Sequence, residues 1–296
     1  MLGYACMNRT LRDRAEPLRC NRDMRKATFE ERGLPYASEL ALRNVRDLHA
    51  VLEWNVANDV GFYRCTSTLV PWNSQFDLAE LPDYGAIRSA AERVGSLVRE
   101  EGLRLTFHPD YWCKLASDSA DTRARAVEAI EYHADWLDLM GLERSPYYAI
   151  NVHIGATYGD RAATAERFRA AVDRLSPGAA ARLTVENDDK PGLWGVAELV
   201  EAVGDRVPVV FDYHHHSFTD GGLTYREGFD RAADTWDVRP ATHYSEPACL
   251  REGSEDARPQ AHARFVASVP GWLRERSDVM IEAGGKERAL QRLRAG

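Results

Sequence analysis

Short apolar runs alternate with longer amphipathic stretches along the whole chain. The runs have three to five residues, which is typical of buried strands, and the stretches between them repeat apolar residues at helical spacing. We predict strands at Leu2–Cys6, Phe62–Cys65, Arg104–Phe107, Tyr148–Val152, Arg182–Val185, Val207–Phe211, Arg239–Thr242 and Val279–Ile281. We predict helices at Glu39–Ala57, Ala86–Glu101, Thr122–Met140, Ala163–Leu175 and Trp194–Val203. Eight strand–helix units in 296 residues predict an α/β fold, a (β/α)8 TIM barrel that forms a single domain over residues 1–296.

A doubly wound open sheet is the alternative architecture for this alternation. No GxGxxG motif follows the first predicted strand, which disfavours the dinucleotide-binding form of that fold.

Six successive predicted strands, the third to the eighth, are each followed by a histidine or a carboxylate. Because the carboxyl ends of barrel strands converge on one face, these side chains are expected to meet there. Carboxylates and neutral imidazoles together suit divalent Mn, Fe or Zn. Six ligands are too many for one ion, so the pattern predicts two or three neighbouring ions, an arrangement suited to cleaving a phosphodiester. In chain order the six residues are His108, His153, Glu186, Asp212, His243 and Glu282.

The stretch VVFDYHHHSF, residues 209–218, adds a further candidate ligand at the sixth strand. Asp212 and His215 form a D-x-x-H pair, in which the first member is expected to point into the barrel mouth and the second to reach in from the loop. An Asp after an apolar run is also a common helix cap. His214 and His216 are expected to face elsewhere, toward solvent or packing.

Composition narrows the class of protein. The net charge of −8 argues against broad nonspecific nucleic-acid binding, yet it leaves a local basic groove open, because carboxylates that hold metal ions add to the negative count. No apolar run approaches the roughly 20 residues of a membrane span, and the amino terminus lacks signal-peptide features, so a cytoplasmic protein without membrane contact is expected. Five dispersed cysteines without a CxxC pair predict reduced thiols. No obligate protein partner is evident.

Seven motifs resemble, in order, those of the UV-damage endonuclease family of metal-dependent TIM-barrel repair nucleases. They span nearly the whole chain: LGYACMNRTLR, NVRDLHAVLEWN with GFYRCTSTLVP, VHIGATYGDR, LTVENDD, FDYHHH, HYS and MIEAGGKE. The resemblance implies an endonuclease that uses a metal-activated water to cleave damaged double-stranded DNA beside a UV-type or other distorting lesion. It also implies two to three divalent ions, with Mn favoured over Fe or Zn.

The same resemblance implies a ligand set and several substrate contacts. One metal would be held by His108, His153 and Glu186, and a second by Glu186 as a bridge with Asp212, His243 and Glu282. A third would use His215 and His262, the histidine of RPQAHARFV. Tyr4 and Asn8 match the opening motif at the damaged-DNA site. Apart from the resemblance, an endonuclease would make Arg9, Arg12 and Lys286 candidate phosphate contacts, with a solvated surface charge as the alternative for each.

Several positions depart from the family pattern. Asn73 and Ser74 stand where a histidine is usual, and Ala241 and Gly284 stand where lysines are usual. A Gln-Tyr pair that probes damaged bases is replaced by the pair Tyr111 and Trp112. These two rings could wedge into a distorted duplex or wall a small-molecule pocket.

Two other functions therefore stay open at this point. A multinuclear metalloenzyme acting on a small molecule, either an isomerase or a metal-dependent oxygenase, would use the same barrel and metal cluster, and the lost lysines and acidic balance motivate it. A metal-stabilised binding protein without catalysis is the non-enzymatic alternative.

Overall fold

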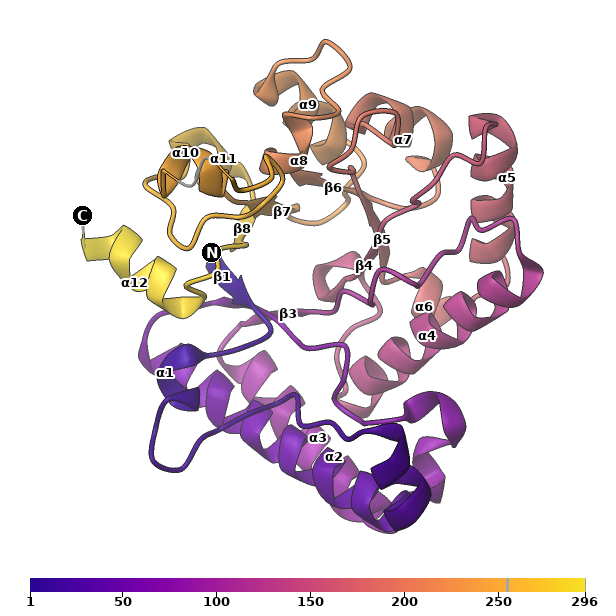
Figure 1. Ribbon diagram of the computed structural model, residues 1–296, viewed down its shortest axis with the longest axis vertical. Coiled ribbons are helices and arrows are strands. Elements are labelled where there is room, and N and C mark those ends of the chain that lie inside the picture. Colours follow the sequence, from indigo (N-terminus) through magenta and orange to yellow (C-terminus); the bar gives the residue numbers. More distant parts are fainter. Residues whose placement is uncertain (254–255, 296) are drawn as a thin grey trace.

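Eight parallel strands form a barrel at the centre of the molecule, and helices surround it (Figure 1). The computed structural model describes residues 1–253 and 256–295. The strands lie in the order β3-β2-β1-β8-β7-β6-β5-β4. Their bounds are β1 Leu2–Ala5, β2 Phe62–Arg64, β3 Arg104–Thr106, β4 Ile150–Val152, β5 Leu183–Glu186, β6 Val209–Asp212, β7 Ala241–Tyr244 and β8 Asp278–Ile281.

A parallel bridge between Phe107 and Ile150 closes the barrel between β3 and β4. The amide of Phe107 donates to the carbonyl of Ala149 at 2.8 Å, and the amide of Asn151 donates to the carbonyl of Phe107 at 2.9 Å. The predicted TIM barrel is confirmed.

Helices follow the strands around the barrel, and all five predicted helical stretches are helical over most of their length. Most boundaries differ by up to three residues, and the largest difference is that the first long helix begins at Lys26 instead of Glu39, although a break at Gly33, whose φ is 60°, divides it. Glycine tolerates that angle, and Pro35 two residues later is compatible with the first turn of a new helical segment. The helices are α1 Arg9–Arg12, α2 Lys26–Ala57, α3 Tyr84–Glu100, α4 Ala120–Leu139, α5 Arg161–Val172, α6 Pro177–Ala180, α7 Val196–Val203, α8 Tyr213–His216, α9 Tyr225–Ala233, α10 Ala248–Arg251, α11 Gly271–Arg276 and α12 Glu287–Ala295.

Strand ends differ from the prediction by one or two residues, and this changes where the polar residues sit. Glu186 and Asp212 are the last residues of β5 and β6 rather than the first residues after them. His243 lies inside β7, because that strand starts and ends two residues later than predicted. All three side chains are therefore fixed by strand backbone, which holds them more rigidly than a loop would.

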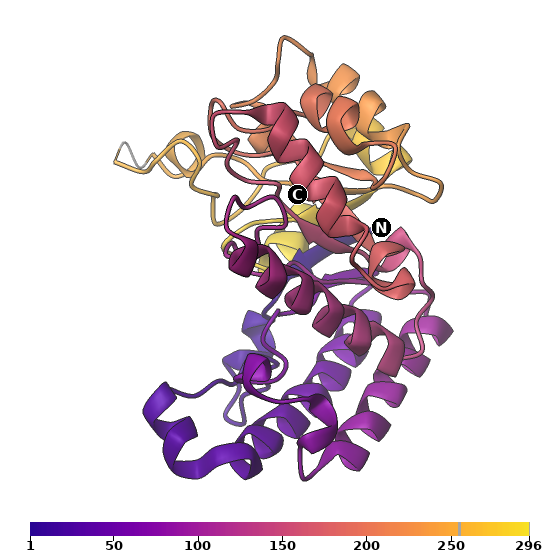
Figure 2. The same ribbon diagram turned by 90° about the vertical axis from the view of Figure 1, so that its right-hand side faces the viewer.

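The two ends of the barrel differ in chemistry. At the amino end, Arg104 is fully buried and its Nη1 lies 3.1 Å from Oδ2 of the buried Asp278. Arg239 approaches the other oxygen of Asp278 at 3.1 Å. At the carboxyl end, α1 and the start of α2 project to the same side as α10 (Figure 2). Within the described ranges, no helix combines the length and apolar character that crossing a membrane requires.

Candidate metal centre

The carboxyl ends of β3 to β8 bring together the six residues predicted from the strand ends. His108 and His153 follow β3 and β4, and Glu282 follows β8. Glu186, Asp212 and His243 come from the strands between them. Residues far apart in the sequence thus meet on one face because the strands are parallel and adjacent.

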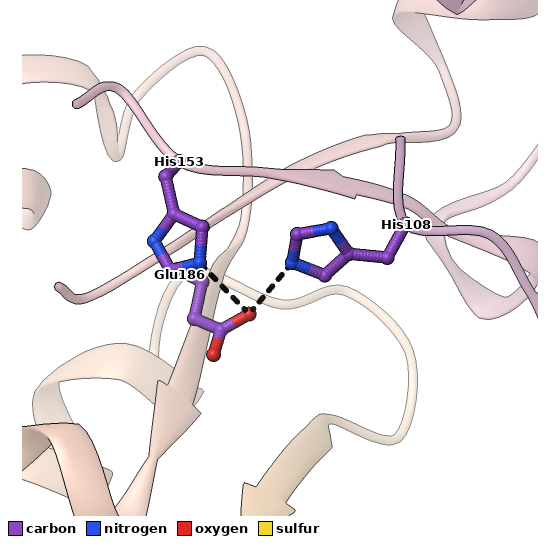
Figure 3. A group of neighbouring side chains, drawn as sticks. All are labelled: His108, His153 and Glu186. Atoms are coloured by element: carbon purple, nitrogen blue, oxygen red, sulfur yellow. Dashed lines mark ion pairs between the residues drawn. The ribbon is translucent and has the colours of Figure 1, made fainter. Parts of the chain in front are cut away.

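Glu186 lies at the centre of this cluster, and only 1% of its surface is exposed. Its Oε2 is 3.4 Å from Nε2 of His108, 3.9 Å from Nε2 of His153 and 3.0 Å from Nδ1 of His243 (Figure 3 shows the first two). Its Oε1 is 3.3 Å from Nδ1 of His215. One buried carboxylate therefore faces four imidazoles, the geometry of a ligand shared between cations.

Three overlapping groups of ligand atoms each fit within 4.8 Å. One of them is the expected first site, and another contains Asp212, His243 and Glu282 of the expected second site without the bridging Glu186. The third places His215 with Glu186 and Asp212, while His262 belongs to none of these groups among the described residues. The groups are His108 with His153 and Glu186, Glu186 with Asp212 and His215, and Asp212 with His243 and Glu282.

Buried atoms without hydrogen-bond partners show that this donor set fits metal ions. Oδ1 of Asp212 accepts from the amide of His215 at 2.7 Å and caps α8, whereas Oδ2 is buried and has no donor among the described residues. Nδ1 of His153 and Nδ1 of His243 are also buried without a well-aligned hydrogen bond among the described residues, although carboxylate oxygens of Asp188 and Glu186 lie 3.3 and 3.0 Å away. Because an unsatisfied buried polar atom costs free energy, a coordinated cation is the partner that such atoms suit. Imidazole and carboxylate ligands fit Mn, Fe or Zn.

The electrostatics of the site also favour cations. Burial opposes ionisation of Glu186, yet the imidazoles of His243 and His153 hold its pKa well below the usual range. Burial likewise opposes protonation of His215, but the carboxylates of Asp212 and Glu186 raise its pKa well above the usual value. In both cases the surroundings stabilise positive charge next to buried carboxylates, which is the condition for binding divalent ions.

Neighbouring side chains orient the central carboxylates. Asn151 lies on β4, two residues before His153 and on the same strand face. Its side-chain amide donates to Oε2 of Glu186 at 2.5 Å. Asn187 accepts from the amide of Asp212 at 2.8 Å and donates to its carbonyl at 3.1 Å. Such supporting contacts fix the position of metal ligands and tune their basicity.

Arg64 is a component of the site that the sequence did not reveal. It ends β2, and its guanidinium forms an ion pair with Oε1 of Glu282. The β2 end carries neither a histidine nor a carboxylate, so the pattern of strand ends gave no signal there. Asn151 was not predicted either. It lies two residues before His153, and residues two apart on a strand point to the same face, so this spacing could have indicated it.

The remaining candidate residues lie around the cluster. Tyr4 is buried, donates to Asn55 at 2.7 Å and accepts from Asn8 at 2.8 Å, and Asn8 also caps α1. Lys286 is half-buried on the loop after β8. A direct contact of Tyr4, Asn8 or Lys286 with substrate stays a prediction.

The loops that carry Arg9 and Lys286 are fastened together. The buried carboxylate of Glu287 accepts from the amides of Arg9 and Thr10 at 2.8 and 2.7 Å. Nε of Arg9 donates to the carbonyl of Gly284 at 2.8 Å. These contacts hold the β1–α1 loop against the β8–α12 loop at the edge of the cluster.

Comparison with known proteins decides the family. The family model described as UV-endonuclease UvdE matches residues 1–295. The chain belongs to this family. The UV-damage endonuclease of Schizosaccharomyces pombe is 33% identical over 302 residues, covering 98% of this chain and 49% of that protein. The UV DNA damage endonuclease of Bacillus thuringiensis subsp. konkukian is 28% identical over 264 residues, covering 85% of this chain and 80% of that protein.

Solved structures agree on the fold. The crystal structure of SacUVDE superposes with a TM-score of 0.81 at 24% identity, covering 97% of this chain and 94% of that chain. The chain spans about half the length of the S. pombe and Neurospora crassa UV-damage endonucleases that it matches. The UvdE family likeness therefore covers the whole barrel.

The three neighbouring histidines of this UvdE chain have different surroundings. His215 alone faces Glu186, whereas Nε2 of His214 lies 3.3 Å from the carbonyl of Gln260. His216 packs against Phe211 with ring centroids 5.2 Å apart. His214 and His216 are both buried, so of the two expected alternatives they face packing and not solvent.

This difference predicts separate effects of substitution. His215→Ala is expected to remove about one equivalent of bound metal, because the middle ligand group loses a donor. His216→Ala is expected to keep the metal and to lower the free energy of unfolding by about 1–3 kcal/mol through lost packing. Element analysis and chemical denaturation of both variants measure the two effects. Equal metal loss in both would contradict the assignment of His215.

Proposed function

We propose that the chain is a divalent-metal-dependent endonuclease that hydrolyses a DNA phosphodiester beside a UV-type or other distorting lesion. The observation that carries this proposal is the buried Glu186 carboxylate shared by four imidazoles, in a chain of the UV-endonuclease family. When bound, the ions would activate a water and neutralise charge on the scissile phosphate. We propose two to three ions, Mn foremost and Fe or Zn as alternatives.

The residues of the chain itself have distinct parts in this proposal. Glu186, Asp212 and Glu282 supply the carboxylates, and His108, His153, His215 and His243 supply the imidazoles of the centre. His262 is proposed as an added ligand, since its ring centroid lies 6.1 Å from that of His215.

Exposed aromatic rings favour DNA over a small molecule as the substrate. Tyr111 is 86% exposed and Trp112 is 47% exposed, on the loop after β3. An aromatic ring in the wall of a small-molecule pocket is normally largely buried in the protein. A ring that stacks on unpaired bases is exposed to solvent before DNA binds. Together with Arg9 and Lys286 as phosphate contacts, these rings would hold the deformed duplex over the centre. A DNA substrate also agrees with the cytoplasmic location expected from the sequence.

Nicking of supercoiled plasmid tests the proposal. We expect the metal-loaded protein to nick UV-irradiated plasmid at least about tenfold faster than an unirradiated preparation of the same plasmid, because unstacking a damaged base costs less. Treatment with a chelator should abolish nicking, and Mn²⁺ added back should restore it. Equal nicking of both plasmids, or nicking that survives complete metal removal, would overturn the proposed function.

A further inference from the structure

The segment from Arg9 to Lys26 is strongly basic in an otherwise acidic chain. It holds seven arginines or lysines and three carboxylates, whereas the chain as a whole has a net charge of −8. The segment begins just after β1, so it leaves the barrel on the same face as the metal centre. A local positive region on an acidic protein directs a polyanion to that face.

Four arginines of this region and of the neighbouring helix line one cavity of about 400 Å³. Arg12 comes from α1, Arg19 and Arg22 from the segment between α1 and α2, and Arg43 from α2. Asp23 is the carboxylate in the wall of the cavity. The cavity is thus positive overall, and its walls come from three separate pieces of chain.

Buried contacts fix the wall that carries Arg19 and Arg22. Asn44 is fully buried, accepts from the amide of Arg22 at 2.9 Å and donates to its carbonyl at 3.0 Å. Asp47 accepts from the amide of Arg19 at 2.8 Å and pairs with the Arg22 guanidinium at 2.7 Å. The backbone here is held in one arrangement, and Arg22 serves mainly to hold it.

The other three guanidinium groups keep donors that protein atoms do not use. Arg12 contacts the sulfur of Met7, and Arg43 lies 3.6 Å from Glu39 in an exposed pair. No hydrogen bond or ion pair involves the Arg19 guanidinium in the part of the chain that the structure describes. Guanidinium groups bind phosphate through paired N–H donors, so the free donors of three guanidinium groups around one cavity are suited to a phosphate.

We propose that this cavity binds one backbone phosphate of the DNA duplex, outside the metal centre. The proposal rests on the proposed function and adds a second, sequence-independent anchor for the same substrate. Such a contact positions the duplex without reading its sequence. It also explains how a chain with a net charge of −8 holds a polyanion.

Binding across a salt series tests the cavity. The metal-loaded protein is titrated with a lesion-bearing duplex whose scissile phosphate is a neutral methylphosphonate, so that it is not cleaved there. The triple variant Arg12→Gln, Arg19→Gln, Arg43→Gln is expected to bind about tenfold more weakly and to lose about 0.9 from the log–log salt slope, the contribution of one phosphate. The matched control is Arg174→Gln, an exposed arginine before β5 at the opposite end of the barrel, which should change neither value.

A methylphosphonate scan locates the phosphate. In this scan, one further phosphate at a time is replaced by a neutral methylphosphonate. At one position the replacement should weaken binding by the wild-type protein, and the same replacement should have no effect on binding by the triple variant. If the triple variant had the affinity and salt slope of the wild-type protein, the proposal that the cavity binds a phosphate would be overturned. The endonuclease proposal would still stand if the protein nicked irradiated plasmid. A wild-type protein that bound no duplex at any salt concentration would overturn both proposals.

Discussion

Glu186→Gln is expected to lower the rate of lesion cleavage by at least about a thousandfold. The substitution keeps the shape of the side chain but removes the charge that faces four imidazoles, with oxygen–nitrogen distances of 3.0 to 3.9 Å. Metal ions supply several kcal/mol of transition-state stabilisation, and each 1.36 kcal/mol is about tenfold in rate. Single-turnover cleavage of a lesion-bearing duplex measures the loss.

A matched substitution separates this effect from a general loss of charge. Glu166→Gln removes an exposed carboxylate on α5 that belongs to none of the three candidate ligand groups, and it should leave the cleavage rate unchanged. Near-normal turnover in Glu186→Gln would contradict the assignment of Glu186 as the shared ligand.

Asp278→Asn is expected to lower the free energy of unfolding by about 3–5 kcal/mol, the usual effect of removing one partner of a buried ion pair. Arg104 is fully buried, and its Nη1 lies 3.1 Å from the Asp278 carboxylate. Burial already lowers the pKa of Arg104, and Asp278 is the carboxylate that opposes this shift. Without that negative charge, the guanidinium stays in the barrel interior with carbonyl partners alone. Urea denaturation measures the difference.

An exposed ion pair provides the control for this prediction. Asp205→Asn breaks the pair between Arg169 and Asp205 at the surface, where solvent screens the charges, and should shift the denaturation midpoint very little. Asp278→Asn protein should still bind its full metal content when folded, because Asp278 lies at the opposite end of the barrel. Similar shifts of the denaturation midpoint in the two variants would show that the buried pair of Arg104 and Asp278 contributes little to the free energy of unfolding.

The barrel and the ligand cluster could be predicted because both follow from local patterns. Apolar runs at regular intervals identify the strands, and parallel topology alone then brings the strand ends together. The positions of His108 and Glu186 needed no knowledge of side-chain contacts. The family resemblance added the order of motifs, which the match over residues 1–295 confirms.

Other features depend on contacts that no local pattern encodes. Arg64 pairs with Glu282, which lies 218 residues further along the chain, and an arginine at a strand end gives no metal signal by itself. The early start of α2 was missed because Gly33 and Pro35 interrupt the helical pattern. The cavity wall is set by Asn44 on α2, whose buried side chain holds a segment that looks like an ordinary polar loop in the sequence.

The metal content of purified protein tests the central claim most directly. Element analysis by mass spectrometry, after loading with Mn²⁺ and removal of unbound ions, counts the equivalents held by the wild-type protein and by Glu186→Gln. The three overlapping ligand groups predict about two to three equivalents in the wild-type protein and at least one fewer in the variant. One equivalent or none in the wild-type protein, or the same content in both proteins, would contradict a multinuclear centre built around Glu186.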